Sequence, residues 1–298
     1  MATSSPAHAA ATFRFAPSPN GRLHLGHALS ALINRRMADA AGGRLLLRIE
    51  DIDVTRCRPE FQRAIHEDLA WLGVHFDGEV RRQSEHFAEY GAALGRLVEA
   101  GLVYPCFCSR QQVRQAIASR EAEAARPWPV DPDGAPLYPG TCKGISGSET
   151  SDRIARGEPH LLRLDMTKAL AALPAPPAYI VFDPEGGGSL VNARPERWGD
   201  VVLARRDTPT SYHLSVVVDD ALQGVSHVVR GRDLEAATDI HVVLQKLLGL
   251  PTPRYHFHAL LLDETGQKLA KSRISESLAD LRARGVTAGE VRARLGFA

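Results

Sequence analysis

Two histidines near the start of the chain stand three residues apart. His24 and His27 flank Gly26 in the segment HLGH, which follows a turn with Pro and Gly and precedes a helical pattern. The free N–H groups at the start of a helix attract phosphate, and glycine lets a nucleotide approach the backbone closely. Both histidines can donate hydrogen bonds to phosphate oxygens. The alternative is that one histidine caps the helix and the other packs in the core.

Two lysines far along the chain form a second candidate phosphate site. Lys268 and Lys271 lie in the segment KLAKS, which ends at Ser272. Lysine ammonium groups can offset the charge that builds up on phosphate oxygens and on pyrophosphate when an α-phosphate is attacked. Two lysines in a polar loop are otherwise usually only solvated charge.

Three of the four cysteines lie within one third of the chain. Cys106 and Cys108 belong to the segment CFC, and Cys142 follows a Pro-Gly pair, whereas Cys57 stands apart. In a chain that looks cytosolic, this distribution favours a metal over disulfides. Thiolates suit tetrahedral zinc, and a closed site would be structural. The alternative is three buried thiols, and we interpret Cys57 as a packing residue.

The segments that must hold these groups alternate between strands and helices. Apolar runs predict strands at 12–16 and 43–49, and helical periodicity covers 25–41, 59–72 and 87–100. This alternation is typical of an α/β fold with a doubly wound, Rossmann-like parallel sheet.

The regular pattern weakens after Cys106 and resumes near residue 200. Beyond that point we expect strands at 200–204, 226–229 and 258–262, and helices at 211–222 and 234–248. Thr287 and Glu290 form a capping box before a last helix. The chain should therefore divide into a disordered tail (1–11), the first half of a catalytic domain (12–105), an inserted zinc-bearing domain (106–192), the second half of the catalytic domain (193–250) and a helical unit with the KLAKS segment (251–298).

The composition is that of an ordinary soluble protein. The 298 residues include 36 basic and 35 acidic side chains, for a formal charge of +1. Any nucleic acid must then be held by local cations. No apolar run approaches the roughly 18 residues of a membrane span, so we expect no membrane partner and a cytoplasmic location. The weak candidates for RNA contacts are Arg81, Arg82, Arg205 and Arg206.

Together the two phosphate motifs resemble the signatures of class I aminoacyl-tRNA synthetases. Leu25 replaces the usual isoleucine of the first motif, and Leu269 and Ala270 depart from the commonest residues of the second. Further segments narrow the resemblance to the glutamate branch and extend it over most of the chain: RFAPSPNG at 14–21, RIEDID at 48–53 with Arg56, PTSYH at 209–213, VVVDD at 216–220 and VVRGRD at 228–233.

This resemblance implies roles for individual residues. The substrates would be L-glutamate and ATP with Mg²⁺, and the catalytic groups would be His24, His27, Lys268 and Lys271. ATP would be bound by His24, Gly26, His27, Lys271 and Ser272. The inserted domain would receive the acceptor, and the last unit would be similar to a stem-contact domain. The glutamate pocket would be lined by Arg14, Phe15, Ala16, Pro17, Ser18, Glu50, Tyr212 and Arg230.

The chemistry of glutamate agrees with this assignment. Its two carboxylates and one ammonium need both cations and an anion in a partly buried pocket. Arg14 and Arg230 would supply the cations, and Glu50 the anion. Arg230 favours a carboxylate over an amide, since the resemblance implies a different residue there in glutamine-using relatives. Taken singly, each arginine could instead belong to a structural ion pair.

The resemblance also supplies a fourth zinc ligand. A Cys-x-Cys pair followed by Tyr-x-x-x-Cys places Tyr138 beside Cys106, Cys108 and Cys142. The stretch between Cys108 and Tyr138 is longer than the family pattern. Water or another group could replace the tyrosine.

Only a short helical tail follows Lys271, whereas full glutamyl-tRNA synthetases continue into anticodon-binding domains. This favours the short, monomeric members that activate glutamate without RNA and transfer it to queuosine in the anticodon loop of tRNA(Asp). The alternatives are a truncated synthetase that charges a 3′ end and a noncatalytic regulatory paralogue. A small-molecule nucleotidyltransferase would not explain Arg14, Glu50 and Arg230 together.

Overall fold

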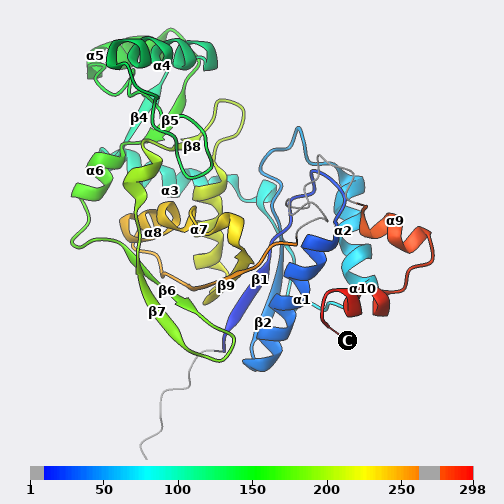
Figure 1. Ribbon diagram of the computed structural model, residues 1–298. Helices are drawn as coiled ribbons and strands as arrows, with labels where there is room; N and C mark the ends of the chain where they lie inside the picture. The colour runs from blue at the N-terminus through cyan, green and yellow to red at the C-terminus, as the bar shows by residue number, and fades with distance from the viewer. Residues whose placement is uncertain (1–9, 262–275, 298) are drawn as a thin grey trace, which may run out of the picture.

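The strands form three hydrogen-bonded sheets in the computed structural model, which describes residues 10–261 and 276–297 (Figure 1). The first sheet is parallel and contains β1 (Thr12–Phe15), β2 (Arg44–Ile49) and β3 (Arg81–Arg82). The second sheet has the order β7-β6-β10-β9, in which only the edge strand β7 is antiparallel. Its strands span Ala178–Phe182 (β6), Gly188–Asn192 (β7), His227–Gly231 (β9) and Arg254–His258 (β10).

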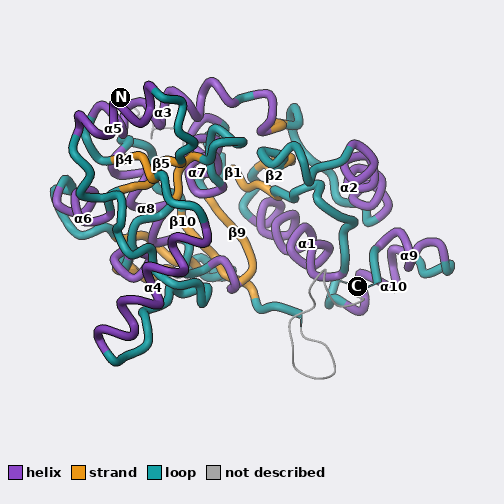
Figure 2. The backbone as a smooth tube through the Cα atoms, turned by 90° about the horizontal axis from the view of Figure 1, so that it is seen from above, coloured by secondary structure: helices purple, strands orange, loops and turns teal. Residues whose placement is uncertain are grey.

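The first two sheets meet where β1 lies beside β9. Thr12 N donates to Ser226 Oγ at 2.9 Å, and Ser226 N donates to Thr12 O at 3.0 Å. The parallel strands therefore form one continuous layer, and Figure 2 shows it from above. The predicted α/β fold with a parallel sheet is confirmed.

The helices beside this layer follow the periodic segments of the sequence. The apolar face of α1 buries Ala28, Ala31 and Leu32 in the same core as Phe13 and Leu45 of the strands. Only α8 differs by more than one residue from its expected limits, because a 3-10 turn at Arg232–Leu234 (η3) precedes it. The bounds are Leu25–Ala40 (α1), Pro59–Trp71 (α2), Phe87–Glu99 (α3), Tyr212–Leu222 (α7) and Thr238–Leu247 (α8).

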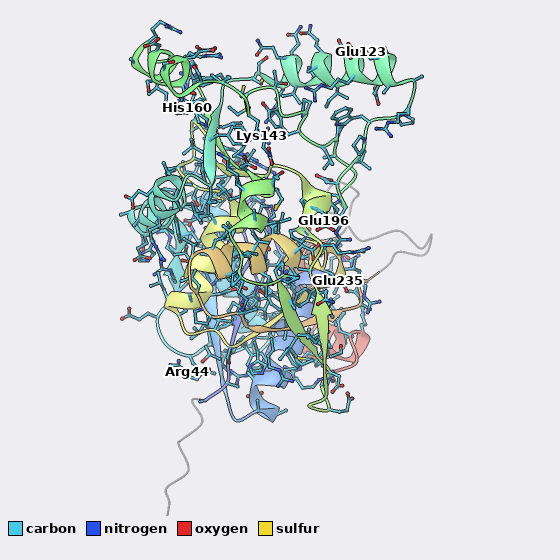
Figure 3. The ribbon with its side chains drawn as sticks, turned by 90° about the vertical axis from the view of Figure 1, so that its left-hand side faces the viewer. Arg44, Glu123, Lys143, His160, Glu196 and Glu235 are labelled. Atoms are coloured by element: carbon cyan, nitrogen blue, oxygen red, sulfur yellow. The ribbon has the colours of Figure 1, made fainter. Side chains whose placement is uncertain are left out.

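A smaller antiparallel sheet forms the base of an upper unit. It consists of β4 (Val103–Cys106), β5 (Leu161–Leu164) and β8 (Val202–Ala204), in the order β4-β5-β8. Figure 1 shows α4 and α5 above it, and Figure 3 places Glu123 and His160 in this unit, far from Arg44 of the main sheet. Further elements are α4 (Arg110–Ala124), α5 (Gly147–Ala155), α6 (Met166–Ala171) and two 3-10 turns at Gln83–Glu85 (η1) and Pro195–Trp198 (η2).

The strands that pair in this upper unit do not coincide with the inserted domain expected at 106–192. The hairpin β6–β7 falls inside that range but pairs with β10 of the main sheet. Strand β8 lies outside the range but pairs with β5. Hydrophobic pattern alone did not reveal β6 and β7, because Ile180 of β6 and Leu190 of the edge strand β7 are exposed.

The strand expected to begin at residue 258 was placed wrongly, because the observed strand ends there. Strand β10 ends at His258, and its buried residues are Tyr255, Phe257 and His258. The apolar run that suggested the later strand instead brings Leu260 and Leu261 to the wall of a cleft. Residues 262–275 lie outside the described part, as do residues 1–9 of the expected tail.

Two short helices end the described chain. They are α9 (Leu278–Ala283) and α10 (Ala288–Arg294), and they bury Leu281 and Val291 in the core that contains α2. The capping box is confirmed, since Glu290 N donates to Thr287 Oγ1 at 3.2 Å and Thr287 N donates to Glu290 Oε2 at 2.7 Å. No helix in the described ranges is long and apolar enough to cross a membrane.

Candidate functional site

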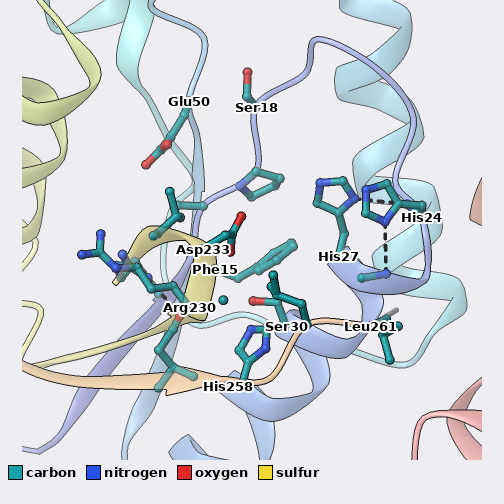
Figure 4. Close-up of a pocket in the computed structure, with 18 of the residues that line it drawn as sticks. Phe15, Ser18, His24, His27, Ser30, Glu50, Arg230, Asp233, His258 and Leu261 are labelled. Carbon is teal, nitrogen blue, oxygen red and sulfur yellow. Dashed lines mark hydrogen bonds between the residues drawn. The ribbon is translucent and has the colours of Figure 1, made fainter. Parts of the chain in front are cut away.

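A cleft of about 580 Å³ opens where β1, β2, β9 and α1 meet. Figure 4 shows Glu50 and Arg230 on one side of it and His24 and His27 on the other. Every expected substrate residue in the described ranges lines this one cleft, namely Arg14, Phe15, Ala16, Pro17, Ser18, His24, Gly26, His27, Glu50, Tyr212 and Arg230. Lys268, Lys271 and Ser272 lie outside the described residues.

The two histidines are held by the first turn of α1. Gly26 N donates to His24 Nδ1 at 3.1 Å, and His24 N donates to His27 Nδ1 at 3.2 Å. Because each Nδ1 accepts a bond, a neutral ring carries its hydrogen on Nε2. A Cβ at position 26 would lie only 3.0 Å from the His24 ring, so glycine permits this arrangement. His24, Gly26 and His27 thus form the cap of α1 and also line the cleft.

Beneath the side of the cleft that carries Glu50 and Arg230 lies a buried network of charges centred on Arg48. Its Nη1 donates to Asp220 Oδ1 at 2.7 Å, its Nη2 donates to Glu50 Oε1 at 3.3 Å, and its Nε lies 3.7 Å from Asp219 Oδ2. The side chain of Arg48 is fully buried, as is that of Asp219. Arg48 therefore fixes Glu50 and ties β2 to α7.

The pKa values of Asp220 and Glu50 are shifted in opposite directions, because burial and the nearby cations balance differently at the two carboxyl groups. Arg14 Nε also contacts Asp220 Oδ1, at 3.3 Å. Although burial opposes ionisation, Arg48 and Arg14 hold the pKa of Asp220 below its ordinary value. Burial raises the pKa of Glu50, and the same two arginines only partly offset it. A ligand ammonium beside Glu50 would favour its charged form.

Arg230 differs from Arg14 and Arg48 in its partners. Its Nη2 donates to Thr238 Oγ1 at 2.6 Å, and its Nη1 lies 3.2 Å from His241 Nδ1. Among the described residues no carboxylate forms an ion pair with it, and its Nε has no hydrogen-bond partner. A buried guanidinium without a counter-ion is costly unless a ligand supplies one. Arg230 is therefore suited to bind a carboxylate from the cleft.

Other lining residues were not expected from the sequence. Asp233 belongs to the segment VVRGRD, which was noted but given no role at that position. His258 and Leu261 were missed because the apolar run suggested a strand at 258–262, whereas β10 ends at His258. The full set of unexpected residues is Asn20, Ser30, Val229, Gly231, Asp233, Leu234, His258, Leu260 and Leu261.

The described residues on either side of the KLAKS segment lie near the histidines. Leu261 lines the cleft, and Ser277 forms a β-bridge with His24. Leu278 N also donates to Leu23 O at 2.8 Å. The described residues that flank 262–275 thus lie beside the end of the cleft that carries His24 and His27.

The three clustered cysteines converge in the upper unit. Their Sγ atoms all lie within 4.8 Å of one another, and Cys108 Sγ is 3.3 Å from Cys142 Sγ. Tyr138 OH lies 3.2 Å from Cys106 Sγ and 3.6 Å from Cys108 Sγ. Zinc–sulfur bonds of about 2.3 Å fit sulfur atoms at this spacing. The donor set is therefore one that could hold a metal ion.

Two of the four cations expected to contact RNA are engaged inside the protein. Arg81 donates to Asp219 at 2.7 Å and also pairs with Glu89, while Arg82 bonds Asp51 at 3.2 Å and Glu85 at 3.0 Å. Arg81 is therefore no longer a candidate for RNA contact, because its side chain is only 14% exposed and has a structural role. The side chain of Arg82 is 39% exposed. Arg205 and Arg206 are exposed, and neither has an ion pair within the described ranges.

Comparison with known proteins identifies the family. The family described as "tRNA synthetases class I (E and Q), catalytic domain" matches residues 10–289, and the chain belongs to it. The chain is 47% identical over 288 residues to the glutamyl-Q tRNA(Asp) synthetase of Rhodobacter capsulatus, covering 95% of this chain and 99% of that relative. It is 41% identical to the glutamyl-Q tRNA(Asp) synthetase of Nocardia farcinica, over 95% of this chain and 82% of that protein.

A solved structure agrees with the fold. The chain is similar to a glutamate tRNA ligase from Elizabethkingia meningosepticum in complex with its amino acid, with a TM-score of 0.71 and 27% identity. The similarity covers 88% of this chain and 52% of that ligase, so this chain spans about half of the ligase's length.

We expect Arg48→Met to lower the free energy of unfolding by about 3–5 kcal/mol, because it leaves buried Asp219 and Asp220 with less compensation. Arg58→Met is the control, since Arg58 is exposed and its 3.8 Å contact with Glu60 is at the surface. Urea denaturation of both variants measures the difference. Equal stability of the two variants would contradict the structural role of Arg48.

Proposed function

We propose that this protein activates L-glutamate with ATP and transfers it to the queuosine base in the anticodon loop of tRNA(Asp). The observation that carries this proposal is that Arg230 and Glu50 line the same cleft as His24, Gly26 and His27 at the start of α1. The acceptor is supported by the name of the Rhodobacter capsulatus relative, to which the chain is similar over 99% of that protein's length.

The residues of one end of the cleft complement glutamate. Glu50 takes the ammonium group, and Arg14 and Arg230 supply cations for the two carboxylates. Arg230 binds the side-chain carboxylate, because its planar N–H donors match a carboxylate and no described carboxylate competes with it. An uncharged amide would leave the buried guanidinium uncompensated.

The residues of the other end complement the phosphates of ATP, which enters with Mg²⁺. Gly26 allows close approach, and the Nε2–H groups of His24 and His27 donate to phosphate oxygens. Lys268, Lys271 and Ser272 complete this end as proposed ligands. The glutamate α-carboxylate oxygen attacks the α-phosphorus, the bond to pyrophosphate breaks, and these donors offset the charge on the leaving group.

Transfer requires an acceptor with a hydroxyl that can attack the mixed anhydride. One hydroxyl of the vicinal pair on the queuosine ring attacks the glutamyl carbonyl, its proton is lost, and AMP leaves. This ring resembles a ribose diol closely enough to use the same site, and bases in flexible RNA loops can be splayed outward by a protein. Arg205 and Arg206 are exposed cations near the start of α7 that could contact the RNA backbone.

The Cys106, Cys108, Tyr138 and Cys142 group is proposed to hold one structural zinc ion. The sulfur spacing and the phenolic oxygen within reach support this set. A closed tetrahedral site would clamp the end of β4 to the segment before α5, in a region with few regular elements.

The division into a split catalytic domain, an inserted unit and a C-terminal unit is likewise proposed, with the limits of the insert adjusted to the strand pairing. A doubly wound sheet is supported by the order β3-β2-β1-β9-β10-β6, in which the strand order reverses direction at β1. We propose that the protein acts as a monomer.

The first test of this function is ATP–pyrophosphate exchange in the absence of RNA. We expect exchange with glutamate and not with glutamine, and we expect Arg230→Gln to raise the KM for glutamate by about 100-fold, since it removes one partner of a buried charge pair. Arg232→Gln is a matched control, because Arg232 is two residues away and its side chain is 70% exposed. No glutamate-dependent exchange, with or without tRNA, would overturn the proposed activity and favour a regulatory role.

A second test locates the acceptor. Labelled glutamate is supplied with tRNA(Asp) that contains queuosine, with the same tRNA that contains guanosine, and with tRNA(Glu), and nuclease mapping then finds the label. We expect label only on the queuosine nucleotide, because its ring offers the vicinal diol within an exposed loop. Label on the 3′ adenosine of tRNA(Glu) would show a conventional, shortened synthetase instead.

A third test concerns the metal. The purified protein should contain about one zinc per chain, and Cys106→Ser should lose the metal and lower the melting temperature, because metal binding contributes folding free energy. Cys57→Ser should keep the zinc, since Cys57 lies outside the cluster. Elemental analysis and thermal unfolding measure both effects. A folded, metal-free unaltered protein would reduce the cluster to buried thiols.

A further inference from the structure

Two histidines behind the cleft form a chain of hydrogen bonds that ends on Arg230. His241 of α8 lies between Arg230 and His213 of α7, with its Nδ1 3.2 Å from Arg230 Nη1 and its Nε2 3.2 Å from His213 Nδ1. His241 is 2% exposed. Tyr212, which lines the cleft, packs edge-on against both imidazoles.

The direction of these bonds follows from Arg230. A guanidinium has only donors, so His241 Nδ1 must accept and must carry no hydrogen. His241 then carries its hydrogen on Nε2 and donates it to His213 Nδ1. Each imidazole is therefore neutral and held in one tautomer.

The titration of the two rings agrees with this geometry. Burial and the nearby charge of Arg230 lower the pKa of His213 to about 4, and the same causes hold the pKa of His241 well below its usual range. Both rings stay neutral near pH 7. Neither repels Arg230, and neither cancels its charge.

This arrangement contrasts with the buried arginines Arg14, which lines the cleft, and Arg48, which lies behind it. Arg14 and Arg48 both contact Asp220, so protein carboxylates already offset their charges. Arg230 is oriented by two neutral acceptors, Thr238 Oγ1 and His241 Nδ1, and lies over the rings of Tyr255 and Phe257. A protein carboxylate in the place of His241 would hold the guanidinium equally well, but it would compete with a substrate carboxylate.

We propose that His241, held in its tautomer by His213, is a positioning residue that aims Arg230 at the cleft while leaving its charge for the substrate. This inference rests on the proposed glutamate activity and adds a specificity role for residues that do not line the cleft. The neutral pair makes the site select a carboxylate over a carboxamide.

The test compares three substitutions of His241 in the full chain by glutamate-dependent ATP–pyrophosphate exchange. His241→Glu places a carboxylate against Arg230 and should raise the KM for glutamate by on the order of 100-fold, with a much smaller change in kcat. His241→Leu removes the acceptor and should raise the KM by about tenfold. His241→Gln restores a neutral acceptor and should keep the KM within a few-fold of the unaltered protein.

Glutamate specificity provides a readout that packing alone would not move. In His241→Glu the ratio of kcat/KM for glutamate over glutamine should fall by at least about tenfold, because an offset charge no longer distinguishes the two side chains. Calorimetric titration with glutamate and thermal unfolding separate weaker binding from loss of the fold. If His241→Glu does not fold, the comparison of the Leu and Gln variants decides the question.

The outcomes separate the two proposals. Absence of glutamate-dependent exchange in the unaltered protein overturns the proposed function itself. A glutamate KM that is unchanged in His241→Glu, or that rises equally in the Leu and Gln variants, overturns the role of His241 and leaves the proposed function standing.

Discussion

The fully buried guanidinium of Arg48 is the interaction on which the site depends. It joins β2 to α7 through Asp219 and Asp220, and it also orients Glu50 at the wall of the cleft. Arg81, Gln83 and Tyr90 satisfy the remaining acceptor positions of Asp219, at distances of 2.7 to 3.0 Å. Buried charges are tolerated only when they are paired and hydrogen-bonded, so these groups restrict how the sheet and α7 can pack. This packing in turn sets the position of Glu50 at the cleft.

The buried arginines around the cleft are of two kinds, those paired with a protein carboxylate and one held by neutral groups. Arg14 shares Asp220 with Arg48, and this shared carboxylate stays ionised because both arginines lower its pKa. Arg230 is held by hydroxyl and imidazole groups and keeps its charge. The proposed glutamate site uses both kinds, because the compensated arginines stabilise the fold and Arg230 remains to attract the carboxylate of the ligand.

The proposed phosphate end of the cleft depends on local geometry instead of on a charge network. His24 and His27 bond to backbone N–H groups within one helical turn, and Gly26 leaves room for the ring of His24. The functional interpretation of HLGH and its alternative, a capped helix, are therefore compatible. The cysteine group is similarly local at Cys106 and Cys108, but Tyr138 and Cys142 reach it only through the fold of the upper unit.

The sequence by itself determined the features that depend on neighbouring residues. Helical periodicity located α1, α2, α3 and α7 to within a residue, and the motifs identified eleven of the residues that line one cleft, because motif spacing and amphipathic faces are local properties. Only the tertiary structure decided which arginine has a counter-ion. Arg48 and Asp220 are 172 residues apart, whereas the acceptors for Arg230 are the hydroxyl of Thr238 and the imidazole of His241, both on α8. The sequence did not determine strands β6 and β7 or the start of α8 either. The exposure of Ile180 and Leu190 and the 3-10 turn before α8 depend on what packs beside them. Charge compensation in a buried site is a sum over distant groups, and no local pattern contains it.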